Sequence, residues 1–402
     1  MNSKLKPKIR FKGFTDDWEQ RKFDDWGTFY YGHSCPKWSV TENSTIPCIR
    51  YGELYTKFGE KIDAVYSYTS INPNKLRFSK GTEVLIPRVG EDPMDYNHCT
   101  WLSLKDVAIG EMISVFNTNQ HPLFSAIMFN ATLQKEFAVR VEGSSVTNLY
   151  FEKLKDINIK YPKIQEQEKI ANIFDNLDNL ITLHQRKCDK LIEIKKSLLE
   201  KMFPQNNSVI PEIRFRGFTD DWEQRKLNDI YTFSQGMQVE IENQSLNKSV
   251  DMEQFIRIID VTTNSEPPRY IYNTTGKGHV ESNDIFFVRY GAVGTVGYGY
   301  TGTIANNLFK LSTNKKYCND FMYQQFANGE FNKKLIEMSA STSMPAINFS
   351  ALNSLTFYET NLDEQNRIGK LFKSIDNLIT LHQRKHDKLN KIKQSLLNDM
   401  FV

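Results

Sequence analysis

Two short motifs in the chain have spacings that could carry chemistry. The glycines of GYGYTG, Gly297–Gly302, have the spacing of a dinucleotide-binding loop. Such a loop must open a helix whose N-terminus holds the pyrophosphate, whereas the following TIANNLFKLSTN predicts a turn and a strand. We therefore expect these glycines to let strands bend or to allow a ligand to approach closely.

The second motif, SEPPRY at Ser265–Tyr270, is close to an amino-methyltransferase motif in which Asn or Asp precedes two prolines and an aromatic residue. Glu266 replaces the Asn or Asp, and Arg269 replaces the aromatic ring that would stack on a flipped base. Because both chemically active ends differ, the motif predicts a loop stiffened by its prolines.

Other catalytic signatures are absent from the sequence. It contains no GxxxxGK[ST] loop and no Glu/His cluster with metalloenzyme spacing. EIK at Glu193–Lys195 has the spacing of a nuclease motif, but it falls on a predicted coiled-coil helix without a supporting sheet. The sequence thus predicts no catalytic residue, no metal and no cofactor.

Length and composition indicate a globular protein of about two domains or more. The 402 residues are 40% hydrophobic and 25% charged, with a net charge of +3, which permits a nucleic-acid partner without requiring one. No apolar run has membrane-spanning length, and no apolar stretch follows the basic N-terminus as in a signal peptide. Five scattered cysteines without a CxxC pair argue against disulfides or zinc and fit a reducing cytoplasm: Cys35, Cys48, Cys99, Cys188 and Cys318.

An internal duplication organises the chain. IRFKGFTDDWEQRK begins at Ile9, and IRFRGFTDDWEQRK begins at Ile213, with only Lys12 and Arg216 differing. DNLITLHQRK occurs identically at Asp178–Lys187 and Asp376–Lys385. The chain therefore has the order stub, variable region and long helix, repeated once.

The two long helices are predicted from a 3-4 apolar spacing typical of a coiled-coil seam. The predicted seam positions are Ile170, Ile173, Leu177, Leu180, Leu191, Ile194 and Leu198 in the first helix, and Ile368, Leu371, Ile375, Leu378, Leu389, Ile392 and Leu396 in the second. A polar layer interrupts each seam, at His184 and Lys187 and at His382 and Lys385, and we expect it to fix register. Periodicity leaves parallel and antiparallel pairing open. Each helix, from about residue 165 to 203, would span roughly 58 Å.

The stubs and variable regions predict further structure. Asp16 with Glu19, and Asp220 with Glu223, fit a capping pattern at a helix start, and Trp18 and Trp222 are candidate packing anchors. The variable regions predict mostly strands and loops with a few helical pieces, so each is expected to be a mixed α/β domain. CIRYGEL in the first region is similar to FIRIIDV in the second.

The repeated segments resemble a known family. The GFTDDWEQRK stubs, the YPKIQEQEKIANIFDNLD and NLDEQNRIGKLFKSID entries into the helices, and the LITLHQRK segments are similar to the specificity subunit of type I restriction–modification enzymes. The resemblance covers the whole chain, and the constant segments carry its specific motifs. The variable regions match only in their position and general plan.

The resemblance implies an α+β fold in which two mixed α/β target recognition domains are joined by an antiparallel coiled coil with internal pseudo-two-fold symmetry. The implied divisions are 1–160 for the first stub and recognition domain, 161–204 for the central helix, 205–358 for the second stub and recognition domain, and 359–402 for the C-terminal helix. Each recognition domain would bind one half of a bipartite site on double-stranded DNA. Half-sites on one face of DNA lie near one helical turn apart, about 34 Å, which helices of this length could span.

The same resemblance implies partners and a division of labour. The constant segments would dock two methyltransferase (modification) subunits, and motor–nuclease (restriction) subunits would join them. Hemimethylated sites would be methylated at adenine, and unmethylated sites would trigger restriction. The chain itself would be a non-catalytic specificity subunit in the cytoplasm, without a membrane partner.

Candidate DNA contacts follow from residue type, since Arg and Lys contact phosphates and guanine, and Asn, Gln, Ser and Thr contact base edges or backbone. They are Arg50, Tyr51, Lys57, Arg88, Ser144 and Ser145 in the first region, and Gln238, Arg257, Arg289, Tyr290, Asn306, Asn307, Thr342 and Ser343 in the second. The GSSVTN and STSMPAIN loops precede short helical patterns, so their amides are expected to bind phosphate.

Two other classes of function fit parts of the sequence. A coiled-coil scaffold without a DNA role would use the constant segments equally well, and a steep salt dependence of DNA binding would distinguish it. A self-contained methyltransferase is disfavoured by the altered SEPPRY motif and would have to bind a methyl donor by itself.

Overall fold

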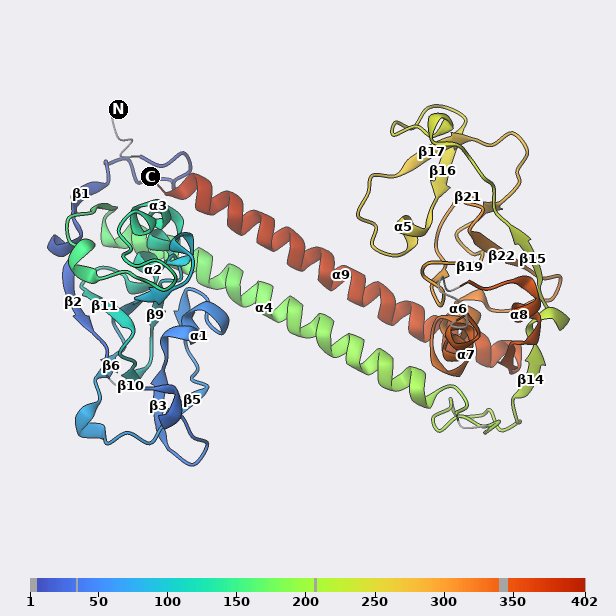
Figure 1. The fold of residues 1–402 in the computed structure, drawn as a ribbon, viewed down its shortest axis with the longest axis horizontal. Coiled ribbons are helices and arrows are strands. Elements are labelled where there is room, and N and C mark those ends of the chain that lie inside the picture. The colour runs from blue at the N-terminus through green and yellow to red at the C-terminus, as the bar shows by residue number, and fades with distance from the viewer. Residues whose placement is uncertain (1–5, 34, 206–207, 340–345, 402) are drawn as a thin grey trace. The chain divides into compact units, whose positions relative to one another are not determined.

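A computed structural model describes residues 6–33, 35–205, 208–339 and 346–401. The chain divides into two compact units, which we call unit 1 (residues 1–183 and 385–402) and unit 2 (residues 184–384). Two long helices, α4 (Ile164–Lys201) and α9 (Leu362–Met400), each contribute one part to unit 1 and the other part to unit 2 (Figure 1).

The globular part of unit 1 contains a five-stranded sheet with the order β2-β11-β7-β9-β4 and a four-stranded sheet with the order β5-β3-β10-β6. The strands are β2 (Gly27–Tyr31), β3 (Ile46–Ile49), β4 (Lys61–Ile62), β5 (Ser67–Thr69), β6 (Phe78–Lys80), β7 (Glu83–Pro87), β9 (Thr100–Leu102), β10 (Lys105–Ile109) and β11 (Ile113–Thr118). A short pair, β8 (Val89–Gly90) and β12 (Thr147–Asn148), and the helices α1 (Tyr51–Thr56), α2 (Pro122–Thr132) and α3 (Gln134–Ala138) complete it.

Unit 2 repeats this plan with two four-stranded sheets, ordered β15-β22-β19-β20 and β17-β16-β21-β18. The strands are β15 (Thr232–Gln235), β16 (Met252–Ile256), β17 (Arg269–Tyr272), β18 (His279–Val280), β19 (Phe286–Val288), β20 (Val296–Gly297), β21 (Gly302–Ile304) and β22 (Leu308–Ser312). The short helices are α5 (Ile258–Val261), α6 (Asn319–Ala327), α7 (Gly329–Ser339) and α8 (Phe349–Ser354). The expected mixture of α and β structure is confirmed in both units, and GYGYTG ends one strand and begins another without opening a helix.

The stubs fold differently from the prediction. Glu19 and Glu223 begin strands rather than helices: β1 (Glu19–Lys22) pairs antiparallel with β13 (Asn158–Tyr161), and β14 (Glu223–Lys226) pairs with β23 (Thr356–Glu359). Backbone pairing with a strand that lies more than a hundred residues away outweighs the local capping pattern. Each stub is thereby fixed to the strand that leads into a long helix.

The tryptophan anchors are confirmed. Trp18 and Trp222 are only 2% and 1% exposed. Trp18 packs edge-on against Phe124 and Phe401 of unit 1, and Trp222 packs in the same way against Phe321 and Phe203 of unit 2. The same aromatic core therefore joins the stub to helix ends in each unit.

The helices pair antiparallel within each unit. In unit 1 the ammonium of Lys393 lies 2.7 Å from Asp178, and in unit 2 that of Lys195 lies 2.7 Å from Asp376. In both pairs a residue late in one helix meets a residue early in the other. His184 and His382 also meet in unit 2, with their Nδ1 atoms 2.8 Å apart, which confirms the histidine half of the polar layer.

The predicted seam is confirmed at ten of its fourteen apolar positions, which are buried or half-buried, and is wrong at the other four. Leu180 and Ile194, and their counterparts Leu378 and Ile392, are 39–43% exposed, and Lys187 and Lys385 are also exposed. Beside the exposed positions, Ile181 and Lys195 and their counterparts Ile379 and Lys393 are half-buried instead, and Cys188 is buried. Apolar residues such as Leu180 and Ile181 occupy adjacent positions along these helices, so the apolar spacing alone did not decide which of them is buried. The Asp–Lys pairs accompany the register that the structure adopts.

An acidic pair beside the helices gives a pH prediction. Lys393 contacts both Asp178 and Glu60 of unit 1. Burial and the neighbouring carboxylate of Glu60 raise the pKa of Asp178 to about 6, although Lys393 opposes this rise. Because the folded state then holds a proton that the unfolded state releases near pH 4, the associated stabilisation is lost as the pH rises through 6.

Asp178→Asn should therefore reduce the fall in unfolding free energy between pH 4 and pH 7, as measured by urea denaturation at each pH. Asp376→Asn is the matched control. Asp376 contacts Lys195 and the side-chain amide of Gln324, whereas Asp178 has the carboxylate of Glu60 beside it. An identical pH profile for wild type and Asp178→Asn would contradict the prediction.

Candidate nucleic-acid interface

In unit 1, three arginines converge on the turn between β10 and β11, which we call the first turn (Gly110–Met112). The amide of Gly110 donates to the carbonyl of Ile49, directly before Arg50, at 2.9 Å. The amide of Ile109 donates to the carbonyl of Arg77 at 2.9 Å, and the amide of Arg88 donates to that of Met112 at 3.2 Å. The backbone thus holds Arg50, Arg77 and Arg88 around one turn, although they come from different parts of the sequence.

Aromatic rings position two of these side chains. The Arg88 guanidinium lies over the rings of Tyr31 and Tyr150, with distances of 4.9 and 5.6 Å to the ring centres. That of Arg77 lies 4.9 Å from the ring centre of Tyr30 and donates to the carbonyl of Tyr31. Cation–π contacts of this kind hold a guanidinium in place without neutralising it.

These arginines keep their charge available. Among the described residues, none of the three guanidinium groups forms an ion pair with a carboxylate. Arg50 and Arg88 are half-buried, where a cation is usually paired, and Arg77 is exposed. Three unpaired arginines around one turn form a local anion-binding surface on a chain of nearly balanced charge. Phosphate groups of a nucleic acid are anions suited to such a surface.

Unit 2 repeats the backbone of this site with different side chains. The amide of Ala305 donates to the carbonyl of Ile256, before Arg257, and the amide of Arg289 donates to that of Asn307. The second turn (Ala305–Asn307) therefore corresponds to the first, and Arg257 and Arg289 correspond to Arg50 and Arg88. Gly278 takes the place of Arg77, since its carbonyl accepts from Ile304.

Arg289 retains the character of Arg88. Both have a buried Nε without a hydrogen-bond partner in the described structure, and Arg289 lies 5.7 Å from the ring centre of Phe309. Arg257, by contrast, is neutralised by Asp260 and Glu266, each at 2.8 Å. The predicted contact at Arg257 thus has an internal role in this structure, while Arg289 remains available.

The other predicted contacts are placed in several ways. Lys57 pairs with Glu53 at 3.2 Å, Tyr51 begins α1 with a partly exposed ring, and Tyr290 follows Arg289 at the surface. Asn306 donates to Gln238 at 2.8 Å, so these two amides meet beside the second turn, and Asn307 completes that turn. Thr342 and Ser343 lie outside the described residues.

That the amides of the two serine-containing loops bind phosphate stays a prediction. Ser144 and Ser145 are exposed but precede the strand β12. In unit 2, the start of α8 is capped by Asn348, whose side chain accepts from the amide of Ala351. The predicted helical pieces are present, as a 3-10 helix at Phe151–Lys153 in unit 1 and as α8 in unit 2.

Arg77 and Glu111 lie at the first turn but are not among the contacts predicted from the sequence. Arg77 precedes a short strand in NKLRFSK, and Glu111 lies in the first turn, with an exposed side chain. Neither position carries a local signal, because its importance depends on which turn the surrounding strands bring beside it. Comparison of the two halves of the chain could have pointed to the turn, since both halves place three residues between the same two strands.

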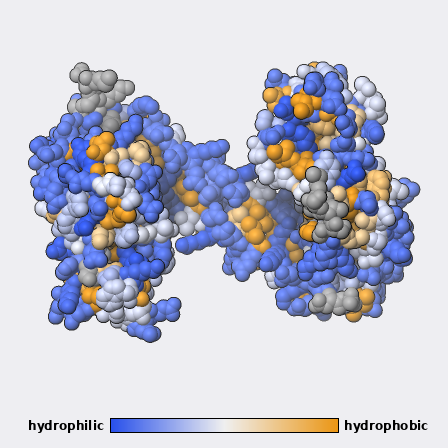
Figure 2. Space-filling view, in the orientation of Figure 1, coloured by the Kyte–Doolittle hydropathy of each residue, from blue (hydrophilic) through white to orange (hydrophobic). Residues whose placement is uncertain are grey.

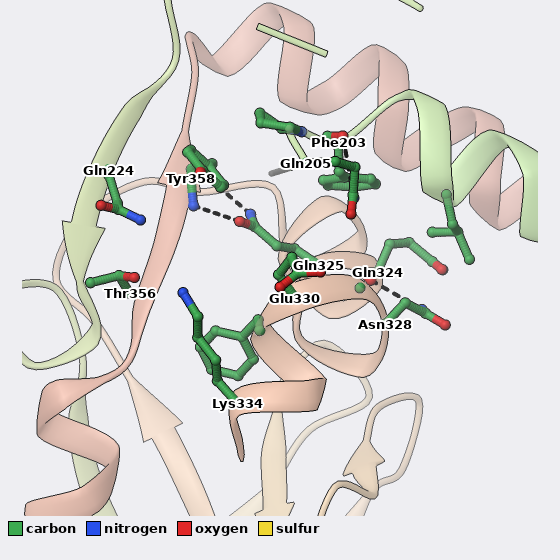
Figure 3. Close-up of a pocket in the computed structure, with 14 residues that line it drawn as sticks. Phe203, Gln205, Gln224, Gln324, Gln325, Asn328, Glu330, Lys334, Thr356 and Tyr358 are labelled. Carbon is green, nitrogen blue, oxygen red and sulfur yellow. Dashed lines mark hydrogen bonds between the residues drawn. The ribbon is translucent and has the colours of Figure 1, made fainter. Parts of the chain in front are cut away.

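Unit 2 also contains a cavity of about 260 Å³ that is lined largely by side-chain amides and not by arginines (Figure 3). The side-chain amide of Gln325 pairs with both backbone groups of Tyr358 along one wall, and Lys334 points into the cavity. The residue that corresponds to Gln325 in unit 1 is Met128, by the offset of 197 that relates Phe124 to Phe321. This amide-lined cavity is therefore not part of the duplicated design.

A second duplicated surface lies on the long helices. We call it the outer helix face: Leu180, Leu183 and Ile392 in unit 1, and Leu378, Leu381 and Ile194 in unit 2. These six side chains are 39–45% exposed, and Figure 2 shows hydrophobic groups at the surface of the helices. Solvent-exposed apolar residues repeated at equivalent positions are typical of a surface that binds another protein.

The described residues contain neither a candidate membrane span nor a candidate metal cluster. No helix among them is long and apolar enough to cross a bilayer. Within the same part of the chain, no three or more His, Cys, Asp and Glu side chains gather where they could hold a metal ion.

Comparison with known proteins agrees with the duplication. A family model described as the type I restriction modification DNA specificity domain matches the chain twice, over residues 15–193 and 219–391. A curated relative, the type I restriction enzyme MjaVIII specificity subunit of Methanocaldococcus jannaschii, is 22% identical over 318 residues, which cover 74% of each chain.

A solved structure shares the fold. The crystal structure of the S subunit of a type I restriction–modification system from M. genitalium matches 99% of each chain with a TM-score of 0.69, at 14% sequence identity. At this identity the match concerns the arrangement of elements, and the side chains around the two turns must be interpreted from this chain itself.

Proposed function

The chain belongs to the family of type I restriction–modification DNA specificity proteins, and from that premise we propose that it selects the DNA sites on which its complex acts. Each unit presents one recognition surface, centred on the first turn in unit 1 and on the second turn in unit 2. Because the side chains around these turns differ, each surface is suited to one half of a bipartite site on double-stranded DNA.

The three unpaired arginines around the first turn carry this proposal. A scaffold without a DNA role has no need of Arg50, Arg77 and Arg88 placed around one turn without carboxylate partners. DNA supplies a regular row of phosphates, and arginine also forms bidentate contacts with guanine in the major groove. The arrangement therefore favours DNA as the ligand. An acidic protein surface, whose charges are irregularly spaced, fits it less well.

We further propose that the chain supplies recognition and no catalysis. Methyl transfer and cleavage would be carried out by two modification (methyltransferase) subunits and by motor–nuclease (restriction) subunits that join the complex. The outer helix face and the stubs, which are nearly identical in both units, would bind the two modification subunits in the same way.

A gel-shift titration tests DNA recognition. The full chain, alone and with its modification subunits, is titrated onto duplex DNA that carries the methylated sites of the host, at several salt concentrations. We expect affinity to fall steeply and linearly on a logarithmic scale of salt. Absence of any salt-dependent binding in both forms would favour the scaffold function.

A substitution on the outer helix face tests the docking proposal. Leu183→Glu together with Leu381→Glu should weaken binding of the modification subunit by about 10- to 100-fold per site, because each change removes one buried leucine contact. Isothermal titration calorimetry would measure it. Ile192→Glu is the control, since Ile192 is 51% exposed but its counterpart is the polar Asn390. Equal effects of the control and the paired change would contradict the assignment.

A further inference from the structure

We propose that the central residue of each turn selects a base: Glu111 selects cytosine in one half-site, and Asn306 selects adenine in the other. This inference rests on the proposed function and deepens it. It starts from the correspondence of the two turns, which share their backbone contacts and differ at their exposed tips, Gly-Glu-Met in unit 1 and Ala-Asn-Asn in unit 2.

The turns are held rigidly enough to present a side chain in a fixed place. In unit 1 the amide of Gly32 donates to Ile113 and the amide of His33 donates to Ile109, so the end of β2 closes the base of the turn. A Cβ at Gly32 would collide with the carbonyl oxygen of Gly110, and one at Gly236 would collide with that of Ala305. Glycine is therefore required at the same place in both units.

The chemistry of Glu111 indicates a single class of base edge. Its carboxylate is exposed and has neither a hydrogen bond nor an ion pair within the described residues, whereas its backbone carbonyl accepts from the Arg88 guanidinium at 3.4 Å. A carboxylate placed among arginines that bind phosphate would repel DNA unless it accepted a hydrogen bond there. In the major groove only cytosine N4 and adenine N6 donate, and the N7 acceptor next to adenine N6 would repel the second carboxylate oxygen. Cytosine is thus favoured.

Asn306 has the complementary chemistry. One N–H of its amide donates to Gln238 at 2.8 Å, and Gln235 donates to its backbone carbonyl. The second N–H and the side-chain oxygen remain available, which together match the N7 acceptor and the N6 donor of adenine. The hydrogen bond to Gln238 restricts the orientation of the Asn306 amide.

Arg88 and Arg289 supply the shared part of both surfaces. Each lies beside its turn through a backbone hydrogen bond to Met112 or Asn307, and each is packed against an aromatic ring. We assign them to the phosphate backbone, where contacts fix position without carrying sequence information. The turns then differ in specificity while they dock in the same way.

Selection of bound duplexes from a random library tests the inference. The full chain, in the form that binds DNA, is used as wild type and as Glu111→Gln or Asn306→Asp. For Glu111→Gln we expect a cytosine requirement at one position of one half-site to weaken about 5- to 150-fold, because a base-specific contact contributes about 1–3 kcal/mol. For Asn306→Asp we expect an adenine in the other half-site to be replaced by cytosine. Glu42→Gln, an exposed loop residue, is the matched control.

The outcomes separate this inference from the proposed function. A bipartite wild-type motif that stays the same in both variants would overturn the base assignment and leave DNA recognition intact. A change in both half-sites from a single substitution would also overturn it. A wild-type chain that selects no motif would remove the proposed function, and the base assignment with it.

Discussion

Replacing Glu364 by glutamine should lower the free energy of unfolding by about 3–5 kcal/mol, because it leaves the partner arginine buried without a counter-charge. Glu364 is fully buried, and both of its oxygens accept from Arg214 at 2.8 Å. Trp222 also donates to it, at 3.1 Å. The pair ties the second stub to the start of α9 within unit 2. Denaturation in urea, followed by tryptophan fluorescence, would measure the loss.

The corresponding pair in unit 1 provides the matched comparison. Arg10 donates to both oxygens of Glu166, at 2.8 and 2.7 Å, but the Nε1 of Trp18 has no hydrogen-bond partner in the described structure. Glu166→Gln should therefore destabilise the chain by a smaller amount, since Trp222 and Thr360 both donate to Glu364 and two fewer hydrogen bonds are lost at Glu166. A destabilisation below 1 kcal/mol for Glu364→Gln would show that the pair is not a buried anchor.

The sign of the pH dependence follows from the same carboxylate. Burial raises the pKa of Glu364, but the hydrogen bonds from Arg214, Thr360 and Trp222 outweigh it, so the net pKa lies below its usual value. The folded state then releases a proton that the unfolded state keeps near pH 4. The stabilisation is present above that pH and is lost as the pH falls through the lowered pKa. In Glu364→Gln this acid-induced loss should disappear.

Changing Arg50, Arg77 and Arg88 together to alanine should reduce DNA affinity by at least about 100-fold at moderate salt, with the larger part from Arg77 and Arg88 because aromatic rings hold them in place. If each arginine neutralises one phosphate, the slope of log affinity against log salt should become shallower by about 3. A gel-shift titration at four salt concentrations measures both quantities.

The controls separate charge from folding. Lys57→Ala removes a cation that is already paired with Glu53, and it should change the salt slope by much less than one arginine does. Arg257→Ala removes an arginine that is neutralised by Asp260 and Glu266, so its main effect should be on stability. If the triple variant kept the wild-type slope with an unchanged circular dichroism spectrum, the arginine cluster would not be the DNA-binding surface.

The repeated segments made much of the architecture predictable. The two long helices α4 and α9 were predictable because the apolar spacing that indicates a helix lies within each segment. The burial of Trp18 and Trp222 was predictable because their side chains are large and apolar. The similarity of CIRYGEL and FIRIIDV indicated a shared domain plan, which the strands β3 and β16 and the helices after them confirm. All of these features depend on neighbouring residues or on comparison of the two halves.

The seam and the stubs show where local patterns were insufficient. Leu180 and Ile181 are adjacent and both apolar, so periodicity could not decide which of them faces the partner helix. The pairing of Asp178 with Lys393 was invisible in the sequence, because those residues are far apart along the chain. Glu19 followed a capping pattern, yet its backbone pairs with Tyr161.

By itself, the sequence determined that two similar halves carry different surfaces, since duplication and helix periodicity are properties of the chain read in order. The tertiary structure alone decided which charged groups are available to a ligand. Arg88 is unpaired and Arg257 is paired, although both are arginines that follow short apolar strands. The reason is physical: the free energy of a charged side chain depends on the groups within a few ångströms of it, and folding brings those groups from distant parts of the chain.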